Sequence, residues 1–425
     1  MSKSKSGKMK GEAKRELKPK LRFPEFVEQE IQAVRLEDVT AESRIRNEQE
    51  LPSTAVMGVS KVEGIVPMEE RIIAKDISRY KLLQTDWFAY NPMRLNIGSI
   101  ARWQGESDVL VSPDYVVFNC TNEDGLGIDP AYLDHFRHSY PWEQFVDEAG
   151  DGGVRVRIYY KDIARLQLAL PSILEQQKIA DCLSSLDELI AAHSRKLDAL
   201  KAHKKGLMQQ LFPREGKTLP RLRFPEFKDA PVWEEDSLIN LAQFRRGSFP
   251  QPYGLPKWYD QNNGMPFVQV YDVDDNFRLK PVTKNRITPA AAEQSVFIPK
   301  GTIVVTLQGS IGRVAITQYD AYVDRTLLLF ESFRRPIETV FFAYVIYNLF
   351  EIEKQKAPGG IIKTITKEVL SGFVVKLPSP EEQKRVADTL STLDDLIAAQ
   401  TQKMKSLNDH KTGLMQQLFP SLEEN

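Results

Sequence analysis

The apolar positions follow their clearest pattern in two segments, residues 171–213 and 377–420, which repeat each other at an offset of 207 residues. From the shared Pro-Ser onward they align without a gap, are identical at 26 of 43 positions, and end in LMQQLFP. Apolar residues recur at alternating steps of four and three, which is the a/d stripe of a coiled coil. The stripe, predicted to be a helix-pair interface, consists of Ile179, Leu183, Leu186, Ile190, Leu197, Leu200, Leu207 and Leu211 in the first copy, and Val386, Leu390, Leu393, Ile397, Met404, Leu407, Leu414 and Leu418 in the second.

Polar residues interrupt the stripe at the same two places in each copy, His193 and Lys204 in the first, Gln400 and Lys411 in the second. A polar residue at such a position costs stability but can fix register and partner. Each helix is expected to end at Phe-Pro, because proline does not continue a helix. About 35 residues at ~1.5 Å rise give a rod of roughly 50 Å. Two helices that pack separately on their own domains are the alternative to a pair.

A shorter repeat, LRFPEF, precedes each large segment at 21–26 and 222–227, and suits either docking or a simple linker. Between these marks, 27–170 and 228–376 share a plan but little sequence. Short apolar runs and frequent turns predict α+β domains in which DWFAYNPMRLNIGSIA matches GTIVVTLQGSIGRVAI, and VSPDYVVF matches VDRTLLLF. The predicted division is a basic disordered arm at 1–20, a first domain at 21–170, a helix at 171–213, a second domain with its leading linker at 214–376, a helix at 377–420 and a tail at 421–425.

Composition is that of a folded, soluble chain of two or three domains, with 425 residues, 42% hydrophobic and 27% charged. The longest apolar run, 339–350, is too short to span a bilayer. The N-terminus lacks the apolar region of a secretory signal. Cys120 and Cys182 provide no disulfide framework, which fits a reducing compartment. We therefore expect a cytoplasmic protein without a membrane partner.

The net charge of −1 gives no support to a nucleic-acid partner by itself. Residues 1–22 hold nine Lys/Arg and two Glu, so the remainder carries −8. Residues 27–170 hold 15 basic and 24 acidic side chains, a net of −9, and 228–376 hold 18 and 16, a net of +2. Any DNA-binding face must therefore be a local patch.

Searches for catalytic and metal motifs find none that is complete. No G-x-x-x-x-G-K-[ST] or G-x-G-x-x-G loop occurs in its required context. NPMR at 91–94 lacks the residues that amino-methylation chemistry needs, and HFRH at 135–138 has no neighbouring ligand signature. DVDDN at 272–276 lacks the spacing of an EF-hand. The sequence predicts no catalytic residue and no metal site.

The arrangement resembles the specificity subunit of type I restriction–modification enzymes, over essentially the whole chain after the basic arm. Its sharpest marks are LPSILEQQKIA and LPSPEEQKRVA opening helices that end LMQQLFP, with the GSIGRVAI turn between them. The resemblance implies two target-recognition domains separated by two long helices that form an antiparallel coiled coil with pseudo-two-fold symmetry. Each domain would read one half of an asymmetric, bipartite DNA target, and helix length would set the spacer.

The same resemblance implies the partners. These are double-stranded DNA, two methylation subunits docked on the helices, and two restriction (translocase–nuclease) subunits. The subunit itself would be non-catalytic and hold no cofactor, because S-adenosylmethionine, ATP and magnesium belong to the partners.

Base reading requires Arg or Lys for guanine and Asn or Gln for adenine. Any single candidate can equally be a solvated surface residue. The DNA-binding candidates are Arg44, Arg46, Asn47, Arg94, Asn96 and Arg102 in the first domain, and Arg245, Arg246, Gln251, Lys257, Gln269, Gln308 and Arg313 in the second.

Two other classes of protein remain open. A coiled-coil scaffold with two protein-binding domains and no nucleic-acid role fits the composition nearly as well, and the acidic first domain favours it. A self-sufficient methyltransferase or nuclease is disfavoured by the missing motifs.

Overall fold

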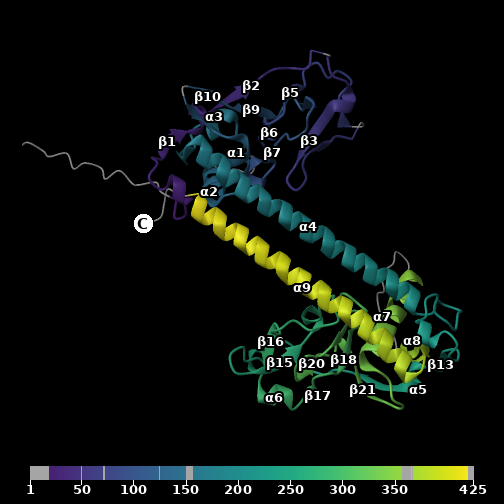
Figure 1. Cartoon of the computed structure of the whole chain (residues 1–425). Coiled ribbons are helices and arrows are strands. Elements are labelled where there is room, and N and C mark those ends of the chain that lie inside the picture. The colour runs from purple at the N-terminus through teal and green to yellow at the C-terminus, as the bar shows by residue number, and fades with distance from the viewer. Residues whose placement is uncertain are drawn as a thin grey trace, which may run out of the picture. The chain divides into compact units, whose positions relative to one another are not determined.

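The chain forms two compact units, seen in a computed structural model that describes residues 19–48, 50–69, 72–123, 125–149, 157–356, 365 and 367–419. Unit 1 comprises residues 1–192 and 404–425, and unit 2 comprises 193–403. The predicted arm, except for its last two residues, and the predicted tail lie outside the described residues. Each unit thus holds one globular domain, the start of one long helix and the end of the other (Figure 1).

The domain of unit 1 is built from short strands in small sheets. Its elements are β1 Gln32–Arg35, β2 Thr40–Ser43, β3 Val56–Ser60, β4 Gly64–Pro67, β5 Lys81–Leu83, β6 Phe88–Tyr90, β7 Ile100–Arg102, β8 Val109–Val111, β9 Val116–Cys120, β10 Asn122–Glu123, β11 Leu126–Gly127, α1 Pro130–Phe136, α2 Tyr140–Glu148, α3 Tyr160–Ile163 and β12 Gln167–Leu170. One four-stranded sheet has the order β2-β9-β6-β7 and another β4-β3-β8-β5, while β1 pairs antiparallel with β12 and β10 with β11.

The domain of unit 2 contains β13 Glu234–Ser237, α5 Leu238–Leu241, β14 Ala242–Arg246, β15 Met265–Val268, β16 Asn285–Ile287, α6 Pro289–Ala292, β17 Val296–Ile298, β18 Ile303–Thr306, β19 Val314–Ile316, β20 Ala321–Val323, β21 Leu327–Phe333, α7 Thr339–Lys356, α8 Lys367–Ser371 and β22 Val374–Leu377. Its sheets have the orders β14-β21-β18-β19 and β16-β15-β20-β17, and β13 pairs antiparallel with β22.

These two domains have the same strand topology. Replacing β1–β9 by β13–β21 and β12 by β22 converts one set of strand orders into the other, apart from the β10–β11 pair, which has no counterpart in the described part of unit 2. Even the parallel pair is shared, β3 with β8 in unit 1 and β15 with β20 in unit 2, among antiparallel neighbours. The predicted matches are confirmed, since they fall on β6–β7 against β18–β19 and on β8–β9 against β20–β21.

The repeated segments form the two long helices, α4 Ile173–Leu211 and α9 Pro380–Leu418. Every residue of the predicted stripe is buried or half-buried. In both units the ends of the stripe also enter the domain core. Ile179, Leu183 and Leu418 do so in unit 1, and Leu211 and Leu390 in unit 2. Within the described ranges no helix is apolar over enough residues to cross a membrane.

Polar stripe residues of unit 2 are satisfied by the opposite helix. The Gln400 side-chain amide donates to the His193 carbonyl oxygen at 2.8 Å and lies 2.7 Å from His193 Nδ1. Lys204 forms an ion pair with Asp394, which also accepts a hydrogen bond from the Tyr344 hydroxyl. Burial lowers the pKa of Lys204, and the carboxylate of Asp394 opposes that effect.

The equivalent lysine of unit 1 also forms an ion pair with an aspartate of the opposite helix. Lys411 on α9 pairs with Asp187 on α4 at 2.5 Å. His135 of α1 lies beside this pair, with its Nδ1 3.9 Å from Asp187 and its Nε2 3.0 Å from the Ser184 hydroxyl. Each of these lysines therefore joins the two helix segments of its own unit.

The LRFPEF segment of unit 1 docks on the start of α4. Arg22 donates two parallel hydrogen bonds to Glu175, at 2.9 and 2.5 Å, and both side chains are buried. Lys178 lies over the Phe23 ring, 5.2 Å from its centroid, and pairs with Glu25. The motif is a docking segment here rather than a simple linker.

The second LRFPEF segment repeats these contacts on the start of α9. Arg223 donates to Glu382 at 2.9 and 2.7 Å, Arg385 lies 4.9 Å over the Phe224 ring, and Arg385 pairs with Glu226 at 3.1 Å. Two parallel N–H···O bonds are the strongest arrangement of an Arg–carboxylate pair. The bonds to Glu382 accordingly raise the pKa of Arg223.

The glutamine of each Glu-Gln dipeptide closes the helix start against the domain. Gln176 donates to the Gly127 and Pro171 carbonyls at 3.0 and 2.9 Å and accepts from the Asp129 N–H at 2.8 Å. In unit 2, Gln383 donates to the Pro378 carbonyl at 2.9 Å and accepts from the Glu338 N–H at 3.0 Å. The Glu-Gln dipeptide therefore has a structural role.

The phenylalanine of LMQQLFP anchors each helix end. Phe419 packs on Tyr132 and Phe136 of unit 1, with ring centroids 5.3 and 5.5 Å apart. Phe212 packs on Phe341 of unit 2 at 5.4 Å and on Trp233 at 6.3 Å. Each such side chain contributes about 1.5–3 kcal/mol when it leaves water.

We expect Glu382→Gln to reduce the free energy of unfolding by about 3–5 kcal/mol, because it leaves the buried Arg223 guanidinium without its counter-charge. Only 11% of the Arg223 side chain and 2% of the Glu382 side chain are exposed. Urea unfolding of the full chain, followed by tryptophan fluorescence, measures the loss.

Glu226→Gln is the matched control, since Glu226 pairs with Arg385 and the side chains of Arg385 and Glu226 are 53% and 47% exposed. Exposed pairs contribute about 0–1 kcal/mol. Equal losses for the two variants would mean that the buried pair does not stabilise the docked segment.

Candidate nucleic-acid interface

A basic cluster of Arg44, Arg46 and Lys81 lies where the first domain passes from one sheet to the other. Arg44 and Arg46 follow β2 and are exposed, and Arg46 forms an isolated bridge with Lys81 at the start of β5. Burial lowers the pKa of Lys81, and the charges of the two arginines lower it further. Arg44 pairs with Glu42 at 2.8 Å, and because 83% of the Arg44 side chain is exposed, it can turn toward a phosphate at little cost.

Asn47 does not share this exposure. Only 2% of it is accessible, and its amide accepts from the Leu51 N–H at 2.8 Å and donates to the Leu51 carbonyl at 3.0 Å. Arg102 is mostly buried, 3.1 Å from Asp86 and 3.5 Å from Asp134. These placements do not support the predicted DNA contacts of Asn47 and Arg102, because both side chains are already bonded within the domain.

Arg94 and Asn96 are exposed on the connection between β6 and β7. Because β2 and β7 are the opposite edges of their sheet, the structure does not bring these residues to the Arg44 cluster. Asn91 of the NPMR motif accepts a hydrogen bond from the Met93 N–H at 3.0 Å, which is an Asx turn.

Arg245 and Arg246 are exposed on β14 of unit 2, the strand equivalent to β2. Their place before the second sheet therefore matches that of Arg44 and Arg46. The chain then passes through Gly247, where a Cβ would lie 2.3 Å from the Val323 carbonyl oxygen, so only glycine fits. Gln308 and Arg313 lie beyond the opposite edge, on the connection between β18 and β19.

Residues 249–285 of unit 2 carry a group that we call the polar–aromatic cluster: Tyr253, Gln261, Gln269, Tyr271 and Asn285. Asn285 donates to the side-chain oxygens of Gln269 at 2.7 Å and Tyr271 at 2.8 Å, and accepts from Gln261 at 3.2 Å. Gln269 also bonds the hydroxyls of Tyr253 and Tyr271. Gln269 itself is buried, so it positions the exposed members instead of meeting a base as predicted.

Cations lie on the aromatic faces around this cluster. Lys284 is 4.8 Å from the Tyr271 centroid, Arg325 is 5.5 Å from that of Tyr253, and Lys257 is 4.3 Å from that of Trp258. Burial, with a smaller contribution from the charge of Asp272, raises the pKa of Tyr271 to about 12, so its hydroxyl stays a donor at neutral pH. Amides and phenols can bond base edges, while the cations attract phosphates.

Gln251 and Lys257 are exposed in the same stretch, and their contact with DNA stays a prediction. Sequence reasoning missed Lys81, Tyr253, Tyr271, Asn285, Lys284 and Arg325. The density of aromatic and basic residues in RRGSFPQPYGLPKWYD could have identified Tyr253. Nothing in the sequence identifies Asn285, because its neighbours come from distant segments.

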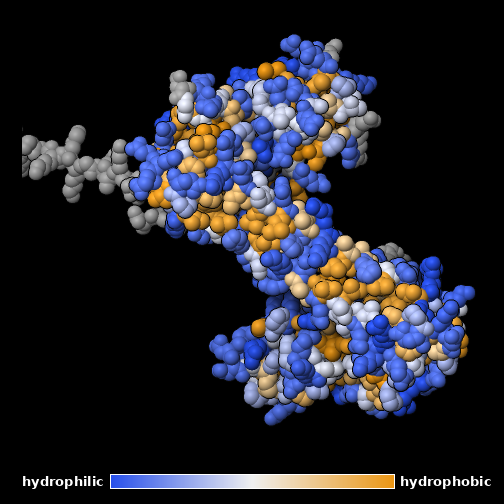
Figure 2. All heavy atoms as spheres, viewed as in Figure 1, coloured by the Kyte–Doolittle hydropathy of each residue, from blue (hydrophilic) through white to orange (hydrophobic). Residues whose placement is uncertain are grey.

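On the face shown in Figure 2, hydrophilic residues in blue cover most of each unit, and hydrophobic residues in orange form separate patches between them. Among the side chains that the structure describes, no group of three or more His, Cys, Asp or Glu is arranged to hold a metal ion. His135 of the HFRH motif is occupied by the packing of α1 on α4.

Comparison with known proteins connects this architecture to a family. Residues 239–409 match the family model described as the type I restriction modification DNA specificity domain. The MjaX specificity subunit of Methanocaldococcus jannaschii, assigned provisionally to type I restriction enzymes, is 26% identical over 362 residues, covering 82% of this chain and 81% of that protein.

Two solved structures have the same fold. The type I restriction–modification S subunit from M. genitalium has a TM-score of 0.62 at 13% identity, covering 95% of this chain and 100% of the other. A chain from a study of complex assembly and conformational transition in the type I R-M system has a TM-score of 0.56 at 18% identity, with coverages of 91% and 97%.

Residues 239–409 are therefore similar to the type I DNA specificity domain, and most of the chain is similar to the MjaX specificity subunit, in agreement with its repeats and motifs.

We expect Asn285→Ala to relax the DNA sequence preference by about 1–3 kcal/mol, because it removes the amide that holds the exposed Tyr271 and Gln261 in place for a base edge. Lys284→Ala should weaken binding equally for all sequences. Selection from a random duplex pool measures both effects.

Asn240→Ala serves as the control, since this exposed amide donates to Asp236 at 2.9 Å, outside the cluster. An unchanged preference in the Asn285 variant would remove the cluster from base reading.

Proposed function

We propose that this chain is the non-catalytic DNA sequence-recognition subunit of a type I restriction–modification complex, and that each domain reads one half of an asymmetric, bipartite target. The observation that carries this proposal is one strand topology used twice with different side chains. At equivalent places the first domain presents a basic cluster, and the second a pair of arginines followed by the polar–aromatic cluster. Unlike side chains read unlike bases, so the two halves of the target differ.

We propose further that α4 and α9 pair along their length as an antiparallel coiled coil with approximate two-fold symmetry, which sets the spacer between the half-sites. The buried stripe and the lysine–aspartate pair of each unit support this arrangement. His193 and Gln400 support it most directly. They are equivalent residues of the repeat, and they contact each other as residues near a two-fold axis do.

The helices also offer equivalent docking positions for the methylation subunits. Leu189 on α4 and Leu396 on α9 are separated by the repeat offset of 207, and they are 44% and 49% exposed. Exposed leucines recurring at one repeat position suit two copies of one partner. Two restriction subunits complete the proposed complex. S-adenosylmethionine, ATP and magnesium are proposed to bind the methylation and restriction subunits and not this chain.

Selection from a random duplex pool by the assembled complex should return a split, asymmetric motif. Deleting residues 194–200 together with 397–403 shortens both helices by seven residues, or about 10 Å. The preferred spacer should then shrink by about three base pairs at 3.4 Å each. Sequencing the selected pool measures motif and spacer together.

Deleting 194–200 alone is the control, because it breaks the register of the pair and should abolish selection. An unchanged spacer after the double deletion would contradict the proposal that helix length sets the spacer. No enriched motif from any form of the complex would instead favour the scaffold function. We expect the isolated chain to bind more weakly than the complex, with a steep dependence on salt.

Replacing Leu189 by Glu should remove one of two methylation subunits from the complex, and replacing Leu396 as well should remove both. Mass measurement of the assembled particles counts the subunits. Leu219→Glu is the control, since Leu219 is also exposed, at 40%, but lies outside both long helices. Retention of two subunits by the double variant would place docking elsewhere.

A further inference from the structure

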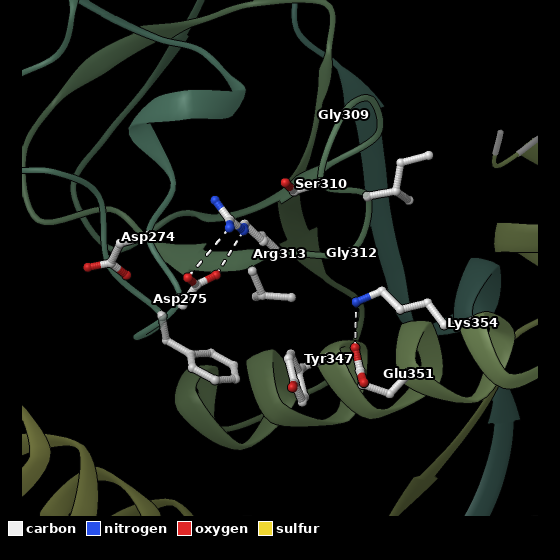
Figure 3. A pocket seen from close by; sticks show the side chains of 12 residues that line it. Asp274, Asp275, Gly309, Ser310, Gly312, Arg313, Tyr347, Glu351 and Lys354 are labelled. Atoms are coloured by element: carbon white, nitrogen blue, oxygen red, sulfur yellow. Dashed lines mark hydrogen bonds and ion pairs between the residues drawn. The ribbon is translucent and has the colours of Figure 1, made fainter. Parts of the chain in front are cut away.

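A hollow of about 500 Å³ opens in unit 2 between the β18–β19 connection and α7. Arg313 and Ser310 lie on one side of it, Tyr347 and Lys354 of α7 lie on the other (Figure 3), and Phe277 also lines it. The polar–aromatic cluster contributes nothing to its lining, so this is a separate feature.

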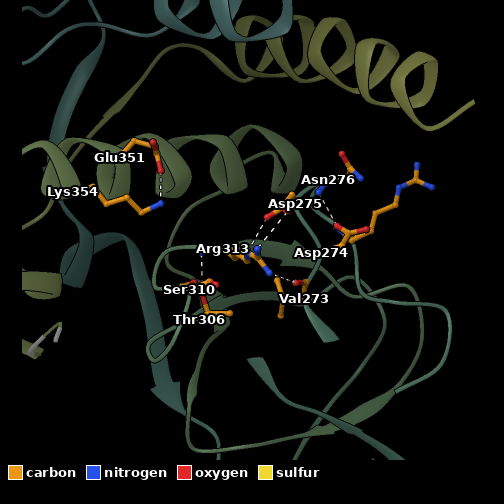
Figure 4. A network of polar contacts seen from close by, with 10 residues as sticks. Val273, Asp274, Asp275, Asn276, Thr306, Ser310, Arg313, Glu351 and Lys354 are labelled. Atoms are coloured by element: carbon orange, nitrogen blue, oxygen red, sulfur yellow. Dashed lines mark hydrogen bonds and ion pairs between the residues drawn. The ribbon is translucent and has the colours of Figure 1, made fainter. Parts of the chain in front are cut away.

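Arg313 is held firmly by its backbone while its charge remains accessible. Its N–H donates to the Thr306 hydroxyl at 3.0 Å, and its carbonyl accepts from the Thr306 N–H at 2.9 Å. The guanidinium bonds Asp275 through Nε at 2.8 Å and Nη2 at 3.4 Å (Figure 4). The Asp275 side chain is 74% exposed, so it can move away from Arg313 without being buried elsewhere.

The loop beside Arg313 is shaped by glycines. Gly309 and Gly312 have φ values of +63° and +86°, and a Cβ on Gly312 would lie 2.8 Å from the Phe350 side chain. Within the part of the chain that the structure describes, the N–H groups of Gly309 and Ser310 have no hydrogen-bond partner. Free N–H groups in a left-handed turn form a concave site for an anion.

A second cation faces the hollow from α7. Lys354 is bonded to Glu351 at 2.5 Å, one helical turn away, and both side chains are about one third exposed. Asp274 also lines the hollow, and one oxygen of its carboxylate accepts the N–H groups of Asn276 and Arg278 at 2.7 and 3.0 Å.

We propose that this hollow binds a phosphate group of the DNA backbone, and that Asp275 occupies Arg313 until the phosphate displaces it. The proposal rests on the proposed DNA-recognition function. Displacement is inexpensive because an exposed ion pair contributes little, whereas a phosphate can take both the guanidinium fork and the loop N–H groups.

The pair of Arg313 and Asp275, which we call the clamp, occurs in the second domain and has no equivalent among the described residues of the first. Asp275 lies on the long connection between β15 and β16, residues 269–284, whereas the equivalent β3–β4 connection of unit 1 consists of residues 61–63. Arg278 of the same connection also pairs with Asp395 of α9 at 2.8 Å, which attaches the loop to the long helix of its own unit.

The test measures binding of a fluorescent random-sequence duplex to the full chain by anisotropy, at low salt and over a salt series. Asp275→Asn should tighten binding about 2- to 5-fold, the range of an exposed ion pair. Arg313→Ala should weaken binding and lower the slope of log affinity against log salt by about one. The double variant should match Arg313→Ala, because Asp275 acts through Arg313.

Glu234→Gln is a matched control, because Glu234 pairs with Arg335 at 2.7 Å. The exposed fractions of the Arg335 and Glu234 side chains, 37% and 73%, match those of Arg313 and Asp275, 36% and 74%. It should change affinity less than Asp275→Asn. Equal gains from both variants, a gain from Asp275→Asn that persists without Arg313, or no duplex binding by the Asp275 variant would overturn the clamp.

These outcomes are separate from the proposed function. Loss of coupling between Asp275 and Arg313, with sequence selection by the complex intact, would overturn only the clamp. Intact coupling without selection of any sequence would overturn only sequence recognition.

Discussion

The buried Arg–Glu pair at each helix start is the interaction on which the rest of each unit depends. Arg22 with Glu175, and Arg223 with Glu382, join the segment that enters a domain to the helix that leaves it. An arginine and a glutamate removed from water must each have a partner, so neither residue can vary alone. The adjoining glutamine then fixes the helix against the domain through backbone groups. Each globular domain is thereby attached to its helix at a defined place.

This attachment explains why the repeat is confined to certain residues. Docking uses the arginine of LRFPEF, the Glu-Gln dipeptide and the final phenylalanine of LMQQLFP, while helix contact uses the apolar stripe and its lysines. The strands between these marks only need to alternate buried and exposed positions, which many sequences satisfy. The two domains can therefore keep one topology with little shared sequence.

Much of the fold could be predicted from the sequence because it is written in periodic or repeated signals. The 39-residue helices and the matching β6–β7 and β18–β19 strands rest on such signals, whereas the repeated LRFPEF segment fitted a simple linker as well as docking. The candidate interface was predicted less well. Asn47 and Gln269 have the residue types that bases require, yet both are buried and bonded within the domain. Asn285 and Lys81 gain their surroundings from distant strands, and no local pattern carries that information.

The antiparallel pairs β1–β12 and β13–β22 have a further consequence. Each pair brings the first and last strands of a domain side by side, through registers such as Gln32 opposite Leu170 and Glu234 opposite Leu377. The segment folded between those strands therefore begins and ends at neighbouring places. A connection can thus be lengthened, or the whole insert exchanged for another of the same topology, without moving the junction with the helix. Each globular domain is thus attached to its helix through one strand pair, and its interior can change without moving that junction.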